Sequence, residues 1–212
     1  EITLPRPWME MSVDEMLPPL RAYGQSLATE ILATGVTVNY WDIGNEVEYG
    51  SAGVAIRSLI QEKSGWTYRP PDTVDPAIGQ TTLVQLLMMP EAERIAWLSQ
   101  HLWPHLGRMF AAVAEGVRAV DPAARFSTHL SGVSAYSAPT LIAFFNTMDA
   151  AGFLVDQLGG SYYPSSSAEP ADRFEASKRM AETVHATLSR QLFVAEFAYP
   201  VGPFSFGTDN WD

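Results

Sequence analysis

The sequence predicts an α/β fold built around a parallel sheet. Segments typical of strands lie near residues 36–45, 124–130, 153–161 and 191–197. Segments whose apolar residues recur at helical spacing separate them, and strands that alternate with helices form βαβ units with right-handed crossovers. With 212 residues, of which 47% are hydrophobic, the chain is large enough to form one domain with a sizeable core.

The first helix is expected to follow Ser12. Ser12 and Glu15 have the spacing of a capping box, in which each side chain accepts a hydrogen bond from the other residue's backbone N–H. Pro18 and Pro19 lack that N–H, so we expect the regular helix to be delayed to that point. Gly35 is expected to end it.

Three later helices are expected between the strands. They cover about 109–120, stopping at Asp121-Pro122, then 139–152, ending at Gly152, and finally the amphipathic segment 170–190. Residues 47–101 come between the first strand and these helices, and we expect them to form a long loop insertion.

Composition excludes several classes of protein. The net charge of −11 disfavours a nucleic-acid partner, because phosphate binding needs clustered Lys and Arg. The absence of cysteine rules out disulfides, thiolate metal sites and cysteine nucleophiles. No run approaches the roughly 20 apolar residues of a membrane span, and the start of the chain does not look like a signal peptide. Phosphate-binding and dinucleotide-binding motifs are absent too, so no cofactor is expected.

His101 and His105 have the spacing of two metal ligands on one face of a helix. Pro104 lies between them and disturbs that turn, and no carboxylate partner is obvious in the neighbouring sequence. We therefore expect no metal site in this protein.

Each of the four predicted strands ends in polar or aromatic residues. In parallel α/β sheets, functional groups gather just beyond the carboxyl ends of the strands. Any one of these groups, such as Asn45 with Glu46, would also suit a helix cap or a solvated turn. Their repetition at four successive strands favours a site. The residues are Asn45-Glu46, His129, Ser161-Tyr162-Tyr163-Pro164, and Glu196 with Tyr199-Pro200.

Two of these residues, Glu46 and Glu196, are carboxylates in unusual surroundings. Glu196 lies between apolar segments, where a carboxylate without partners is costly. Two carboxylates that face each other can divide into one protonated acid and one ionised nucleophile. Retaining glycoside hydrolysis needs such a pair about 5–5.5 Å apart. By contrast, we expect Asp42 to be a hydrogen-bonded structural residue that points inward, and Glu48 to be solvated.

Three short motifs resemble those of a known group of enzymes. "DIGNEV" (42–47), "GGSYYP" (159–164) and "VAEFAYP" (194–200) look like the signatures of strands four, six and seven in clan A glycoside hydrolases. The resemblance is closest to glycoside hydrolase family 53, the arabinogalactan endo-β-1,4-galactanases. Leu102-Trp103-Pro104 resembles a further segment of that family.

The resemblance implies a (β/α)8 TIM barrel. Such a barrel needs roughly 250 residues, so this chain would cover only about strands 4 to 7 and their helices, as one partial catalytic domain over residues 1–212. Open barrel edges would then favour self-association. The family also implies a polysaccharide or oligosaccharide substrate and a secreted protein.

The resemblance assigns roles to individual residues. Glu46 would be the acid/base and Glu196 the nucleophile. Asn45 would bind the sugar 2-hydroxyl, Tyr162 would orient the nucleophile, and His129 would line the cleft. The remaining candidates for substrate binding are aromatic: Trp66, which could stack on a sugar, Trp103 and Tyr199.

Two other interpretations stay open at this stage. The protein could be a clan A hydrolase of different specificity, such as a β-mannanase or a β-glucanase. Alternatively, it could be a non-catalytic carbohydrate-binding barrel fragment, because the first three strands of a barrel are missing.

Overall fold

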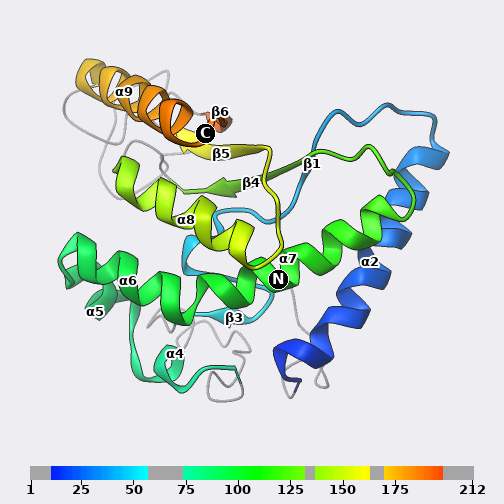
Figure 1. Cartoon of the computed structure of the whole chain (residues 1–212), viewed down its shortest axis with the longest axis horizontal. Helices are drawn as coiled ribbons and strands as arrows, with labels where there is room; N and C mark the ends of the chain where they lie inside the picture. Colours follow the sequence, from blue (N-terminus) through cyan, green and yellow to red (C-terminus); the bar gives the residue numbers. More distant parts are fainter. Residues whose placement is uncertain (1–10, 57–73, 132–136, 163–169, 198–212) are drawn as a thin grey trace, which may run out of the picture.

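A four-stranded parallel sheet lies at the centre of the molecule (Figure 1). The computed structural model describes residues 11–56, 74–131, 137–162 and 170–197. The strands of the sheet are β1 (Trp41–Asp42), β4 (Phe126–Leu130), β5 (Gln157–Tyr162) and β6 (Gln191–Phe197), and they are adjacent in that order.

The predicted strand order and direction are confirmed, since β1 pairs with β4, β4 with β5 and β5 with β6, all in parallel. The first strand is shorter than the predicted segment 36–45. Only Trp41 and Asp42 pair, opposite Phe126 and Ser127. The reason is that β4 itself begins at Phe126, so the residues before Trp41 have no strand beside them on that side.

Four helices pack next to one another beside the sheet. They are α2 (Val13–Ala33), α7 (Trp103–Arg118), α8 (Ala138–Ala150) and α9 (Pro170–Leu188), and each contacts the next in this order. Figure 1 shows α7, α8 and α9 following one another along one side of the strands. Within the described part of the chain, no helix is both long and apolar enough to cross a membrane.

Helix α2 starts where the capping box predicts, but earlier than the prolines suggested. The Ser12 hydroxyl accepts from the Glu15 N–H, and the Glu15 carboxylate accepts from the Ser12 N–H at 2.7 Å. The expected delay at Pro18 and Pro19 is wrong, because the helix begins at Val13 and contains both prolines. Each proline lacks an N–H for the carbonyl four residues earlier, and the residues concerned, 14 and 15, are exposed, so water can bond those carbonyls.

Two glycines allow α2 to lie directly against α7. A Cβ atom on Gly24 would lie 2.2 Å from the Val113 carbonyl oxygen, and one on Gly116 would lie 2.0 Å from the Arg21 carbonyl oxygen. Both distances are far below van der Waals contact, so the two backbones approach each other as only glycine permits. This contact fixes α2 against α7.

The described part of residues 47–101 is folded. It contains the 3-10 turn Val47–Tyr49, a small antiparallel hairpin of β2 (Gly50–Ser51) and β3 (Val54–Ala55), and the helices α4 (Pro76–Gln80), α5 (Leu83–Met88) and α6 (Glu91–His101). Ile78, Leu86 and Leu98 from these helices are buried and join the main core. This segment therefore contributes to the core, which a simple loop insertion would not do.

The two faces of the sheet differ in polarity. Phe126, Leu130 and Leu158 are buried in the core, together with Phe144 of α8 and Phe153. Because side chains alternate along a strand, Ser127 and His129 of β4 and Ser161 of β5 point to the opposite face. On that face the strands carry polar side chains, and these form the site described next.

Candidate active site

A row of polar side chains crosses the sheet on the face opposite the apolar core. Asp42, Ser127, His129 and Ser161 come from the first three strands in turn, and Glu196 stands opposite Ser161 in the β5–β6 register. Ser127 donates a hydrogen bond to the Asp42 carboxylate at 2.6 Å. Partial loss of hydration raises the pKa of Asp42, while the Ser127 hydroxyl and nearby His129 act in the other direction. Asp42 is thus hydrogen-bonded within the row, as expected for a structural residue.

The backbone after β1 turns sharply to present Glu46. Gly44 has a φ of +93°, and a Cβ atom there would lie 2.3 Å from a methyl carbon of the buried Val47. Glu46 itself is left-handed, with φ 50° and ψ 54°. A non-glycine residue in this region is uncommon, and such conformations cluster at functional sites. The turn directs the exposed Glu46 carboxylate toward β5.

A chain of polar contacts connects Glu46 to Glu196. The Ser161 hydroxyl, which is fully buried, donates to Glu46 Oε1 at 2.7 Å. Ser161 Oγ also lies 3.0 Å from His129 Nε2. Because the Ser161 hydroxyl proton is directed to Glu46, Ser161 Oγ accepts a hydrogen bond from the imidazole N–H. The other ring nitrogen, His129 Nδ1, lies 3.8 Å from Glu196 Oε1. The two carboxylates are therefore held at the ends of one network.

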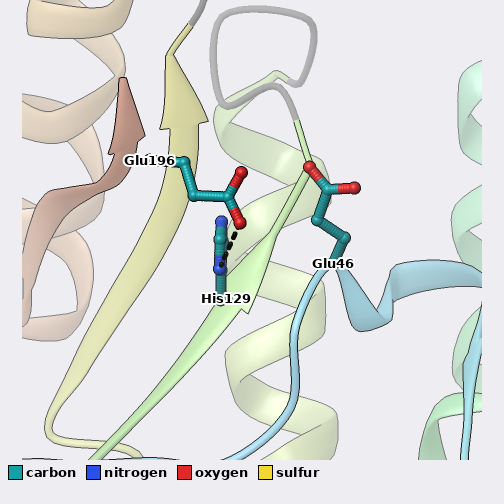
Figure 2. Close-up of side chains that lie close together, drawn as sticks. All are labelled: Glu46, His129 and Glu196. Carbon is teal, nitrogen blue, oxygen red and sulfur yellow. Dashed lines mark ion pairs between the residues drawn. The ribbon is translucent and has the colours of Figure 1, made fainter. Parts of the chain in front are cut away.

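Figure 2 shows the Glu46 and Glu196 carboxylates approaching each other, with the His129 ring beneath the Glu196 carboxylate. One ligand atom from each of these three residues lies within 4.8 Å of the other two. His129 is 3% exposed, whereas the Glu196 side chain is 38% exposed and Glu46 is exposed. The site thus has a rigid imidazole at its base and two carboxylates that reach solvent.

The other predicted site residues have different positions. Asn45 is exposed and immediately precedes Glu46, and its predicted role stays a prediction. Trp66 and Tyr199 lie outside the described residues, and their predicted roles stay predictions.

Trp103 is a core residue rather than a surface that a sugar could stack on. It is 1% exposed, and its ring packs edge-on against Phe144 with centroids 5.3 Å apart. Its indole N–H donates to the Glu48 carbonyl oxygen at 2.9 Å. A contribution of Trp103 to the site is therefore indirect, through the turn that follows Glu46.

Tyr162 lies on the face of the sheet that carries α9. Its neighbour Ser161 points to the site, and alternation directs Tyr162 the other way. The Tyr162 ring stacks on Phe197 with an interplanar angle of 16°, and it lines a cavity with Phe174 and Ser177 of α9. This arrangement does not fit the predicted role of Tyr162 in orienting Glu196.

The expectation that Glu48 is solvated is wrong. Its side chain is 3% exposed, and its carboxylate accepts from the Ser131 N–H at 3.0 Å and from the Ser131 hydroxyl. Ser131 directly follows β4, so this contact fastens the turn after β1 to the end of the neighbouring strand. The sequence gives little sign of it, because the two residues lie far apart in the chain.

The histidine pair has a carboxylate partner that the sequence did not reveal. His101 Nδ1 lies 2.9 Å from Asp75 Oδ2, and Asp75 caps α4 by accepting from the Ala77 N–H at 2.8 Å. Burial raises the pKa of Asp75, but the hydrogen bonds from His101 and Ala77 outweigh it and leave that pKa below its usual value. Burial lowers the pKa of His105, whose Nδ1 is buried and has no hydrogen-bond partner among the described residues.

The lowered pKa of His105 predicts a loss of stability in acid. An unfolded histidine has a pKa of about 6.5. The folded protein binds that proton less readily, so stability is complete above this value and falls as the pH drops toward the folded pKa. Replacing His105 by leucine should make the thermal midpoint fall less between about pH 7.5 and pH 5.5. Leucine at the exposed His185 is the control for losing any histidine. If the thermal midpoint of the His105→Leu protein fell as much as that of the unmodified protein, His105 would not be the source of the acid sensitivity.

Comparison with known proteins supports the fold. No family model and no curated protein matches the sequence. The structure is similar to one described as "Structure of two fungal beta-1,4-galactanases", with a TM-score of 0.59 and 16% identity over 94% of this chain and 48% of that chain. This chain therefore spans about half the length of that galactanase.

The likeness confirms the predicted partial TIM barrel and the predicted resemblance to galactanases at the level of fold. At 16% identity it does not extend to the substrate. The parallel sheet and its alternating helices give this chain the fold of part of a TIM barrel.

Proposed function

We propose that the protein is a retaining glycoside hydrolase that cleaves β-1,4-galactan or arabinogalactan of plant cell walls. The observation that carries this proposal is the convergence of Glu46 and Glu196 at the carboxyl ends of parallel strands. The fold shared with a β-1,4-galactanase adds the substrate class.

The spacing of the two carboxylates favours retention of configuration. An oxygen of Glu46 and an oxygen of Glu196 lie within 4.8 Å of each other. Retaining enzymes separate their carboxyl groups by about 5–5.5 Å, whereas inverting enzymes need roughly 6.5–9.5 Å to hold a water molecule. The present spacing suits direct attack on the sugar.

The proposed reaction is a double displacement. Glu196 attacks the anomeric carbon while Glu46 gives a proton to the leaving oxygen, and a glycosyl ester on Glu196 results. Glu46, now ionised, then takes a proton from water, and the water oxygen displaces Glu196 from the sugar. Exposure of Glu46 fits both of its roles, because it must reach the leaving group and then the water.

Ser161 and His129 position the two carboxylates in this proposal. Ser161 fixes one oxygen of Glu46, which leaves the second oxygen for the substrate. His129 is buried beneath the pair and is held by Ser161, so it cannot easily turn away. Asn45, which is exposed and immediately precedes Glu46, is proposed to bind the sugar 2-hydroxyl.

The edges of the sheet support a proposal about assembly. Within the described residues, β1 and β6 are edge strands, and Val194 and Phe197 of β6 are more than half exposed. An exposed apolar edge strand is a template for pairing. We propose that the barrel is completed by further protein, and a second copy of this chain is one source. If nothing completes it, a non-catalytic carbohydrate-binding role becomes the better interpretation.

Secretion is part of the proposal, because a cell-wall polymer lies outside the cell that degrades it. The alternative specificities are those of a β-mannanase and a β-glucanase. The predicted sugar contacts Trp66 and Tyr199 lie outside the described residues.

A parallel assay tests the proposed substrate. The protein is incubated with galactan, mannan, xylan and β-glucan, and released reducing ends are measured. We expect release from galactan above all. Release from mannan or β-glucan alone would overturn the galactanase assignment and leave a hydrolase of other specificity, whereas sugar binding without any release would favour the non-catalytic interpretation.

A further inference from the structure

We propose that Glu46, His129 and Glu196 form a zinc-binding site, and that a bound zinc ion inhibits hydrolysis. Only the inhibition rests on the function proposed above. The sequence predicted no metal site, because the pair with the spacing of metal ligands, His101 and His105, is interrupted by Pro104.

The three side chains offer a suitable set of ligand atoms. One nitrogen and two carboxylate oxygens lie within 4.8 Å of one another. Zinc bonds to histidine nitrogen at about 2.0–2.1 Å and to carboxylate oxygen at about 2.0–2.2 Å. Ligand atoms bound to one zinc ion are therefore closer to one another than 4.8 Å, so the two carboxylates must move inward to bind it. They can do so, since Glu46 is exposed and the Glu196 side chain is 38% exposed.

The imidazole is already oriented for a metal. His129 Nε2 is bonded to the Ser161 hydroxyl, and Nδ1 faces Glu196 at 3.8 Å. A neutral imidazole that donates through Nε2 has its lone pair on Nδ1. Histidine ligands in metal sites characteristically donate their second ring N–H to an outer partner, which fixes the ring. Ser161 is that partner here, and it also holds Glu46.

The ligand set favours zinc over the other common cations. Two carboxylates neutralise the charge of a divalent ion, and imidazole is a better ligand for zinc than for magnesium or calcium. Calcium takes six to eight oxygen ligands, which these residues do not supply. Three protein ligands leave a fourth position for water. An ion held in this way would occupy oxygens of both Glu46 and Glu196, so neither could take part in the double displacement.

Isothermal titration of zinc chloride into the chelator-treated protein tests the site. We expect one ion per chain and much weaker binding of magnesium. Ser161→Ala keeps all three ligands but removes the outer partner, and should weaken zinc binding by about 10–100-fold. Glu46→Gln and Glu196→Gln each remove a ligand and should weaken it further.

Two control variants test whether zinc binds elsewhere. Glu175→Gln removes an exposed carboxylate of α9, and His101→Gln removes the other histidine that has a carboxylate partner. Both should bind zinc as the unmodified protein does. Undiminished binding by Glu46→Gln, loss of binding in His101→Gln, or equal affinity for magnesium would each overturn the proposed zinc site.

The inhibition is tested separately with the polysaccharide assay. Saturating zinc should stop release of reducing ends, and chelation should restore it. Full activity with zinc bound at the three residues would overturn the inhibition. If zinc binds as expected but the protein cleaves no polysaccharide even after chelation, the proposed hydrolase function fails, the inhibition fails with it, and the zinc site stands.

Discussion

Replacing Glu196 with alanine is expected to lower the hydrolytic rate by on the order of 10⁴-fold or more, because the reaction loses the atom that attacks the sugar. Glu196 is the carboxylate fixed on a strand, in register with Ser161 and beside the buried His129. The nucleophile must stay in place through both displacements, and a strand holds it more rigidly than the turn that carries Glu46.

Added azide should show which role the Glu196→Ala protein has lost. Azide is a small anion that can enter the space left by the carboxylate and attack the anomeric carbon from the same side. No second displacement follows, so the product is a glycosyl azide of inverted configuration. Glu175→Ala, which removes an exposed carboxylate of the neighbouring helix, should keep full activity. A normal rate in Glu196→Ala would remove this residue from the chemistry.

The sequence predicted the parts of this structure that depend on local chemistry. Ser12 and Glu15 form the predicted capping box because both partners lie within one turn. The four strands and their parallel order follow from apolar segments separated by helices, and the carboxylates at their ends follow from the strand ends themselves. The sequence alone therefore predicts that Glu46 and Glu196 lie together.

Features that depend on contacts between distant segments were missed. Which face of β5 a residue occupies is decided by a shift of one position, so "GGSYYP" alone did not show that Ser161 points to the site and Tyr162 to α9. The bond between Glu48 and Ser131 joins segments 83 residues apart. Trp103 matched a motif, but its burial depends on how α7 packs against α8.

Replacing Glu46 with alanine is expected to cause a loss of activity that depends on the leaving group of the substrate. Glu46→Ala should slow cleavage of polysaccharide by about 10²–10⁴-fold, because the departing sugar oxygen needs a proton. An aryl glycoside with an acidic phenol needs no such proton, so its first step should be almost unaffected.

The second step should then limit the rate, because water has lost its base. Azide needs no base, so it should accelerate turnover of the aryl glycoside by Glu46→Ala and yield a glycosyl azide of retained configuration. This outcome is the opposite of the inverted product expected from Glu196→Ala, and the pair of variants therefore separates the two roles. Glu93→Ala, which removes an exposed carboxylate of α6, controls for the loss of charge. An equal loss on polysaccharide and aryl glycoside would show that Glu46 is not the acid, and an azide product of inverted configuration would show that the two roles are exchanged.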